Sequence, residues 1–201
     1  MIVERVIDEF KVYVSKCGHH KCTNKFVVEA WDSSNLEYEV KVIALNLPPL
    51  KAKYSYAWNC VTLNILGKNV GVYGSGKIMF CSSSLDEAEI ILRLLREIIS
   101  EARRMKIDEK MLEEELKLRK RASALKLYNY LPKTNCSLCG EKTCMAFAVK
   151  VLLGERKLTD CKLLSEPSYR HLIDELRAEL GNYLINVLCG KSNLAKLIGM
   201  D

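Results

Sequence analysis

Four cysteines are grouped in the second half of the chain, in the stretch NCSLCGEKTCMAFAVKVLLGERKLTDC at residues 135–161. The first three form the pattern C-x2-C-x4-C, and sixteen residues separate the third from the fourth; they are Cys136, Cys139, Cys144 and Cys161. A zinc site usually combines two short knuckles, or one knuckle with two histidines. Three thiolates from one loop and a fourth from farther along suit a four-iron cluster, whose corners face different directions. The spacing therefore favours an iron–sulfur cluster, with zinc and unligated cysteines as the alternatives.

The rest of the composition argues against structural disulfides. With 201 residues the chain can bury a core without covalent staples. Charged residues at positions 4, 5, 8 and 9 interrupt the apolar start, so no signal peptide is predicted. No apolar run approaches the ~20 residues of a membrane span. We therefore expect a cytoplasmic protein, in which clustered cysteines bind metal more often than they form disulfides.

The residues around the cysteines predict the local structure that would position them. Thr143 can cap a helix that runs through CMAFAVKVLLGE, which places Cys144 in the first turn. There the helix dipole and the free backbone amides favour a thiolate. Gly140 and Gly154 allow the turns that bring Cys161 back toward the first three cysteines.

The stretch LPKTNCSLCGEKTCMAFAVKVLLGERKLTDC closely resembles the small [4Fe–4S] domain of the large subunit of the corrinoid iron–sulfur protein. The B subunit of Rnf-type electron-transport complexes contains the same type of domain. The resemblance covers residues 131–164 and implies one low-potential [4Fe–4S] cluster, held by the four cysteines, in an anaerobic setting. Ser137 and Leu138 depart from the family, because glycine is common in this loop interior. The chain contains no D-x-H-x-x-G motif, so we do not expect a corrinoid site.

The first half of the chain contains patterns typical of β-strands. The predicted strands cover residues 10–15, 25–31, 37–45 and 53–65, and two more within 69–82 are joined by a Gly-Ser-Gly turn. Ser84 and Glu87 form a capping box that begins a helix over 85–105. The buried face of this helix is predicted to carry Ile90, Ile91, Leu94, Leu95 and Ile98.

These elements indicate an α+β protein. We expect an antiparallel α+β domain over residues 1–106, with a helix packed on its sheet. A heavily charged linking helix over 107–130 leads to a small helical cluster domain over 131–201. The tail of that domain is predicted to form two amphipathic helices separated at Gly181.

A second resemblance concerns residues 53–100, where CVTLNILGKNVGVYGSGKIMFCSSSLDEAEIILRLL looks like half of a TATA-binding protein. Trp58 and Tyr73 fall where those proteins carry the phenylalanines that wedge into the minor groove. One half can form the saddle only if two chains associate as a homodimer. With Lys77, these aromatics define a candidate face for a partner protein or nucleic acid. The alternative is that the aromatics belong to the core and the lysines are ordinary surface residues.

The segment CGHHKC contains further metal-ligand residue types. Cys17, His20 and Cys22 could hold zinc, with His19 nearby and a fourth ligand from Cys60 or Cys81. The alternative is a hairpin turn with incidental histidines. Otherwise Cys60, Cys81 and Cys189 fit apolar patterns and are interpreted as core residues.

Two classes of function fit these observations. The first is a low-potential electron-transfer or redox accessory protein that acts on a partner, either a ferredoxin-like donor or a metalloenzyme or corrinoid-type acceptor. Residues 132–164 contain six basic and three acidic side chains, a net charge of +3 that suits an acidic partner. The second is an iron–sulfur-containing nucleic-acid-binding or regulatory protein with a domain like half of a TATA-binding protein. An enzyme with its own substrate is less favoured, because the sequence has no nucleophile–base pair, phosphate loop or C-x3-C-x2-C motif.

Overall fold

The computed structural model describes residues 3–7, 10–16 and 26–197 of the chain. They form two compact units. The sheet unit comprises residues 1–44 and 52–106, and the helical unit comprises residues 45–51 and 107–201. The chain therefore passes from one unit to the other three times. The short segment 45–51 belongs to the helical unit although the residues on either side of it belong to the sheet unit.

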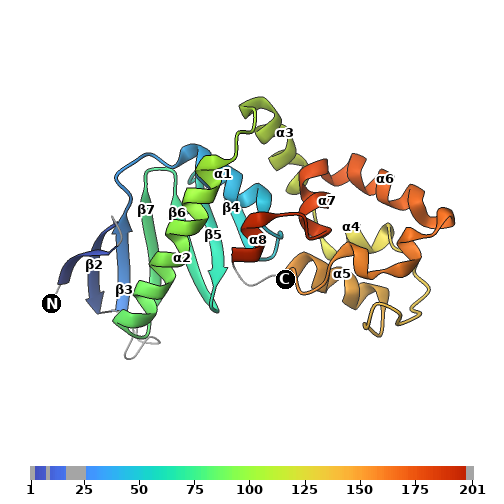
Figure 1. Ribbon diagram of the computed structural model, residues 1–201, viewed down its shortest axis with the longest axis horizontal. Coiled ribbons are helices and arrows are strands. Elements are labelled where there is room, and N and C mark those ends of the chain that lie inside the picture. The colour runs from blue at the N-terminus through green and yellow to red at the C-terminus, as the bar shows by residue number, and fades with distance from the viewer. Residues whose placement is uncertain (1–2, 8–9, 17–25, 198–201) are drawn as a thin grey trace. The chain divides into compact units, whose positions relative to one another are not determined.

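The sheet unit is built on seven strands in the order β1-β2-β3-β7-β6-β5-β4 (Figure 1). All neighbouring strands pair antiparallel. The strands are β1 (Val3–Ile7), β2 (Phe10–Lys16), β3 (Phe26–Trp31), β4 (Ala52–Ser55), β5 (Cys60–Ile65), β6 (Lys68–Tyr73) and β7 (Lys77–Ser82). Together with the helices described below, this sheet confirms the predicted α+β class.

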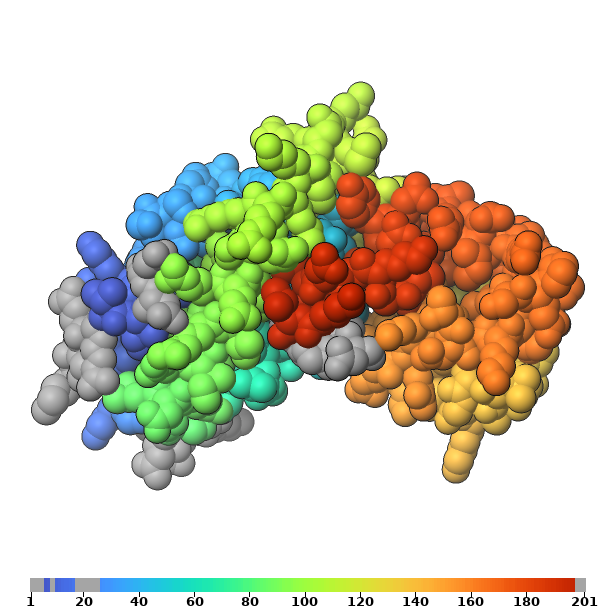
Figure 2. Space-filling view, viewed as in Figure 1, coloured from blue at the N-terminus to red at the C-terminus, as the bar shows by residue number. Residues whose placement is uncertain are grey.

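One face of this sheet is covered and the other is open. Val12, Val28, Val72 and Ile78 have no exposed surface, and each alternates with residues of the other face that are at least partly exposed. The helix α2 (Leu85–Arg104) crosses the covered face, and its outer surface forms the green band in Figure 2. We call the opposite side the open face.

The predicted capping box begins α2, with one difference. The Ser84 hydroxyl accepts a hydrogen bond from the Glu87 amide (3.1 Å), as expected. The Glu87 carboxylate accepts from the amide of Ser83 (2.6 Å) rather than from that of Ser84. The predicted burial of Ile90 is wrong, since this side chain is 52% exposed. The buried stripe instead follows the helical period through Ala88, Ile91, Leu92, Leu95, Ile98, Ile99 and Ala102.

The strand predicted over 37–45 is wrong, because these residues form the helix α1 (Glu37–Asn46). This segment connects β3 to β4, which are separated by three other strands of the sheet. A helix satisfies its own backbone hydrogen bonds, so it can be buried along such a crossing where an unpaired strand cannot. Val40, Val42 and Ile43 are all fully buried. The helix is therefore apolar on several sides. Val40 and Val42 are two residues apart, which is also the spacing of buried residues in a strand.

The strand predicted over 53–65 is two strands, β4 and β5, joined by a turn at 56–59. Asn59 has a φ of +40°. Its backbone amide donates a hydrogen bond to the Tyr56 carbonyl (3.4 Å), and this bond closes the turn. Trp58 therefore lies in a hairpin turn, 75% exposed, and the expectation that it lies on the face of a strand is wrong.

The helical unit contains six α-helices among its described residues. They are α3 (Glu109–Arg119), α4 (Ala124–Asn129), α5 (Cys144–Leu153), α6 (Arg170–Leu180), α7 (Asn182–Leu188) and α8 (Asn193–Leu197), with short 3-10 turns η1 (Leu158–Asp160), η2 (Lys162–Ser165) and η3 (Pro167–Tyr169). The single linking helix predicted over 107–130 is wrong, because residues 120–123 are not helical and separate α3 from α4. Ser123 then caps α4 by accepting from the Lys126 amide (3.2 Å).

The predicted break at Gly181 is confirmed, and α8 is a further helix that the sequence did not predict. Gly181 has a φ of +88°, and a side chain there would meet the Glu115 carboxylate. That carboxylate accepts hydrogen bonds from the amides of Asn182 (3.2 Å) and Tyr183 (3.3 Å). Glu115 therefore caps α7 in the place of a local side chain.

The core of the helical unit gathers the apolar faces of its helices. It includes Leu127, Phe147, Val151, Leu152, Leu176, Leu180, Leu184 and Leu188, with Cys139, Cys144 and Cys161 at its border. Segment 45–51 joins this unit through backbone atoms. The Leu50 amide donates to the Leu152 carbonyl (3.1 Å), and the buried Ser192 hydroxyl donates to the Asn46 carbonyl (2.6 Å). None of the described helices is both long enough and apolar enough to span a membrane.

Candidate cluster site

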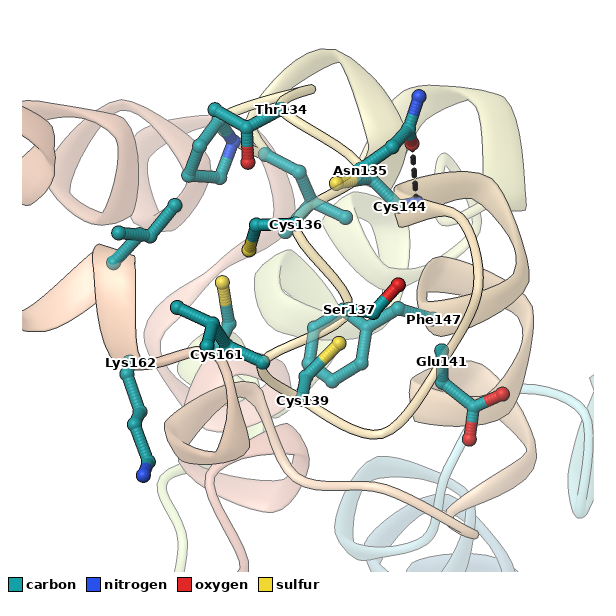
Figure 3. A pocket seen from close by; sticks show the side chains of 14 residues that line it. Thr134, Asn135, Cys136, Ser137, Cys139, Glu141, Cys144, Phe147, Cys161 and Lys162 are labelled. Atoms are coloured by element: carbon teal, nitrogen blue, oxygen red, sulfur yellow. Dashed lines mark hydrogen bonds between the residues drawn. The ribbon is translucent and has the colours of Figure 1, made fainter.

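The four predicted cysteines line one pocket in the helical unit (Figure 3). The empty space among its lining residues, counted together with the adjoining solvent, is about 350 Å³. Cys136 and Cys139 come from the loop after Leu131, Cys144 from the start of α5, and Cys161 from the turn between η1 and η2. Figure 3 shows the four sulfur atoms directed toward a shared space. The structure therefore brings the predicted cysteines together.

The loop that carries Cys136 and Cys139 has an unusual backbone. Lys133, Asn135 and Ser137 have φ values of +59°, +49° and +59°. Residues other than glycine adopt this left-handed region at a cost of about 1–3 kcal/mol each, and they keep it only where their surroundings enforce it. The alternating conformations wrap the loop around the pocket. They also explain why glycine suits the loop interior that Ser137 occupies.

A side-chain hydrogen bond ties this loop to α5. The Asn135 Oδ1 accepts from the backbone amide of Cys144 (2.9 Å), the dashed line in Figure 3. The predicted cap is also present, because Thr143 Oγ1 accepts from the Ala146 amide (3.1 Å). Sequence reasoning missed Asn135. A signal was available, since asparagine tolerates positive φ and readily caps a helix end.

A buried carboxylate fixes the other end of the loop. Glu141 is only 8% exposed and lies 3.0 Å from both Lys150 Nζ and Arg156 Nε. Hydrogen bonds from Lys150 and then from Arg156 lower the pKa of the Glu141 carboxyl. Arg156 also approaches Gly140 so closely that a Cβ there would lie 3.1 Å from its Nη2. The sequence had counted Lys150 and Arg156 only as charges for a partner, whereas both form ion pairs within the unit.

The four thiols are not equivalent. Cys136 is exposed, and hydrogen bonds from the Leu138 amide and the Thr134 hydroxyl lower the pKa of its thiol. Cys161 is buried, and this burial raises the pKa of its thiol; the neighbouring Cys139 and Cys144 raise it further. A thiolate at Cys161 therefore requires a positively charged group beside it. Iron bound by all four sulfurs supplies such charge, so this donor set fits an iron–sulfur cluster.

The second predicted metal site, at Cys17, His20 and Cys22, lies outside the described residues. Over residues 3–7, 10–16 and 26–197, no three His, Cys, Asp or Glu side chains are grouped closely enough to hold a single metal ion. Cys60 is buried, as predicted, and this burial raises the pKa of its thiol. The expectation that Cys81 belongs to the core is wrong, because it is exposed on β7. Cys189 is half-buried at the end of α7.

The remaining predicted site residues lie in the sheet unit. Tyr73 and Lys77 flank the β6–β7 turn on the open face. Lys77 Nζ lies 3.1 Å from Glu29 Oε2 and 5.5 Å from the centre of the Trp31 ring. Trp58 belongs to the neighbouring β4–β5 turn, and Gly74 donates to the Asn59 carbonyl (2.7 Å) to join the two turns.

Comparison with known proteins supports the cluster site. Residues 131–163 match a family model described as "Putative Fe-S cluster". The gamma 1 subunit of the acetyl-CoA decarbonylase/synthase complex of Methanosarcina thermophila is 42% identical over 80 residues, 39% of this chain and 17% of that subunit. The gamma subunit from Methanopyrus kandleri is 50% identical over 50 residues, 25% of this chain and 11% of that subunit.

The chain thus spans less than a fifth of the length of these relatives, and the similarity covers only part of it. The matched family segment contains all four pocket cysteines and supports an iron–sulfur cofactor. No solved structure matches the chain, and the likeness to a TATA-binding protein stays a prediction.

Proposed function

We propose that Cys136, Cys139, Cys144 and Cys161 hold one [4Fe–4S] cluster, and that the protein transfers electrons to or from a partner protein. The observation that carries this proposal is the pocket bounded by four thiols from three separate elements. A single zinc ion draws its four ligands to one point, with each sulfur about 2.3 Å away. The sulfurs of this site instead border an open space, which suits a cluster whose irons each take one thiolate.

The protein's residues divide the pocket into an inner and an outer side. Phe147 and Cys161 are buried and exclude water from the inner side. Cys136 and Leu138, which is 57% exposed, form the outer side. A bound [4Fe–4S] cluster supplies reversible one-electron transfer, and a partner that contacts the loop would approach it closely.

The charges that remain available around the pocket favour an acidic partner. Lys133, Lys142 and Lys162 are exposed, and Lys162 lines the pocket. Complementary charges raise the rate of encounter between partners, and salt reduces that rate. A ferredoxin-like donor fits this surface. The relatives are named as subunits of a multi-subunit complex, which supports a protein partner for this chain as well. We propose a metalloenzyme or a corrinoid-type protein as the acceptor.

The cofactor can be tested by anaerobic purification and analysis of iron and sulfide. We expect a brown protein with about four irons and about four sulfides per chain. Cys144→Ala should lose most of both, because it removes one pocket thiol. Cys81→Ala is the control, since that thiol is exposed on the sheet unit. A colourless protein with one tightly bound zinc would show the proposal to be wrong.

Electron transfer is tested by stopped-flow reduction with a reduced acidic ferredoxin. Reversing the charge in Lys162→Glu should slow the second-order rate and weaken its dependence on salt. Lys110→Glu, at an exposed position on α3, is the control for net charge. A reduction rate that Lys162→Glu leaves unchanged would argue against docking at the pocket.

A further inference from the structure

The open face of the sheet carries a row of alternating basic and aromatic side chains. Lys11 on β2 pairs with Trp31 on β3, and Trp31 pairs with Lys77 on β7. Between β6 and β7, Gly71 pairs with Met79 and Val72 pairs with Ile78. Continuing this register by one residue places Tyr73 beside Lys77. All four residues alternate with buried ones and therefore share the open face. The row reads Lys11, Trp31, Lys77, Tyr73 across four adjacent strands.

The charge of this face is positive. Its described charged side chains are Lys11, Lys53 and Lys77 against the single carboxylate of Glu29. Glu29 is bound to Lys77, whereas Lys11 and Lys53 are exposed. The face therefore attracts anions. Lys77 lies between Trp31 and Tyr73, and Lys11 lies beside Trp31.

The row continues toward an aromatic turn. Tyr73 pairs with Cys60, and Cys60 pairs with Ser55, which is the last residue before the β4–β5 turn. That turn presents Tyr56 and Trp58, with 43% and 75% of their surface exposed. Tyr and Trp are enriched at interfaces, and apolar side chains that are exposed next to one another mark an interaction site better than a single one does.

From this row we infer that the open face binds single-stranded nucleic acid. Bases stack on aromatic rings, and phosphates bind lysines that lie beside those rings. Trp31 and Tyr73 lie on strands that are two positions apart, so their backbones are separated by about 10 Å. This distance exceeds the ~3.4 Å between stacked bases in a duplex, and a duplex also hides the faces of its bases. An extended strand with splayed bases can reach both rings.

An acidic protein is the competing occupant, because it would also meet the lysines. The alternation favours nucleic acid, since a ring stands beside every lysine of the row. A protein that binds by charge would need only Lys11, Lys53 and Lys77, and would leave Trp31 and Tyr73 without a role. The inference does not depend on the cluster, which belongs to the other unit.

The test is fluorescence anisotropy of a labelled oligothymidylate with the anaerobically purified 201-residue chain at physiological ionic strength. We expect Trp31→Ala and Tyr73→Ala each to weaken binding about tenfold, the loss of one stacking contact. Tyr169→Ala in the helical unit is the aromatic control. Both substituted rings are partly buried, so the unfolding midpoint of each variant is measured in parallel.

Lys11→Gln provides a second readout at an exposed position that folding does not require. It should lower the slope of log affinity against log salt by about 0.7, the value for one single-strand phosphate contact. Lys110→Gln should leave that slope unchanged. The inference would be overturned by a duplex that binds as tightly as the single strand, or by polyaspartate that competes equally well. Absence of oligothymidylate binding, or binding that neither Trp31→Ala nor Tyr73→Ala weakens, would overturn it too.

Discussion

The sheet unit and the pocket loop of the helical unit maintain their structure in different ways. In the sheet unit, burial of one face supplies the stability, and residues such as Val28, Ile78 and Leu95 have no exposed surface. In the helical unit, the loop of residues 131–140 is exposed over most of its length and contains three non-glycine residues with positive φ. Few groups hold that loop besides Asn135 and Glu141. The sheet unit is therefore stable through its own core, while the pocket loop depends on what its thiols bind.

Substitutions in the sheet unit and in the pocket loop should therefore act through different physical causes. Where apolar contacts determine a conformation, substitutions act through packing. Where a strained loop brings four thiols together, the bound group contributes folding free energy. The two tryptophans of the chain, Trp31 and Trp58, both lie in the sheet unit. Their fluorescence therefore reports on that unit alone, and the visible absorption of a bound cluster reports on the other.

The largest effect is expected from removal of the cluster. Chelation of iron from anaerobic protein should strongly lower protection from amide hydrogen exchange over residues 131–144, because the strained loop and the start of α5 lose their bound group. Exchange over residues 60–104 should stay unchanged, since that segment is stabilised by its own core. Equal loss of protection in both units would contradict the comparison.

The second-largest effect is expected in the sheet unit, and it should leave the cluster in place. Leu95→Ala removes a fully buried side chain of α2 and should lower the free energy of unfolding of the sheet unit by about 2–5 kcal/mol. The midpoint of urea unfolding by tryptophan fluorescence measures this loss. The iron content should remain that of the unsubstituted protein.

Ile90→Ala is the matched control for this change. Ile90 lies on the same helix and is 52% exposed, so its loss should cost less than about 0.5 kcal/mol. If Leu95→Ala also emptied the cluster pocket, the two units would not be independent in stability.

The site was more predictable from sequence than the fold around it. The four pocket cysteines, the Thr143 cap and the helix after it follow from residue type and spacing, which act over short distances. Glu37–Asn46 was misassigned because its valines alternate as in a strand. Its helical form is set by the need to cross the sheet from β3 to β4.

Other features depend on contacts that spacing does not encode. Glu115 caps α7 from a different helix, and segment 45–51 joins the helical unit from within the first half of the chain. Trp58 was placed on a strand because nothing in KYSYAWNCVTLNI marks the turn apart from Asn59. Asparagine tolerates the positive φ found there, so the signal existed but was weak.

A smaller effect is expected at the pocket loop. Asn135→Ala removes the acceptor of the Cys144 amide hydrogen bond. It also puts alanine, which disfavours positive φ, at a position whose φ is +49°. The loss of such a cap costs about 0.5–2 kcal/mol. The cluster should therefore bleach faster when a chelator is added, as measured by its visible absorption.

Asn135→Asp keeps an oxygen acceptor and tolerates the same backbone, so it should restore most of the lifetime of the cluster. Asn129→Ala, an exposed position at the end of α4, is the control. A cluster lifetime that Asn135→Ala leaves unchanged would show that the hydrogen bond to Cys144 does not hold the loop.

The smallest expected effect concerns acid stability of the sheet unit. The Ser83 amide, the Ser82 hydroxyl and Lys68 all bind the Glu87 carboxylate, and together they lower its pKa from 4.5 to about 2. A carboxyl group with a lower pKa in the folded state stabilises that state above its unfolded pKa. This stabilisation should therefore be complete above pH 4.5 and decline as the pH falls toward 2. Glu87→Gln lacks the titrating group, so the difference in unfolding midpoint between it and the unsubstituted protein should shrink across that window.

Tryptophan fluorescence is the suitable readout for this last comparison, because acid also protonates the pocket thiolates and would disturb any signal from the helical unit. Asp32 has a lowered pKa in the same unit, but it is present in both proteins and cancels in their difference. Added salt separates the contributions to the Glu87 pKa. It screens the ion pair with Lys68, which is 3.2 Å away and partly exposed, and leaves the hydrogen bonds from Ser83 and Ser82 largely intact. If the pH dependence disappeared at high salt, Lys68 would be its main source, and the cap of α2 would contribute little to the acid stability of the sheet.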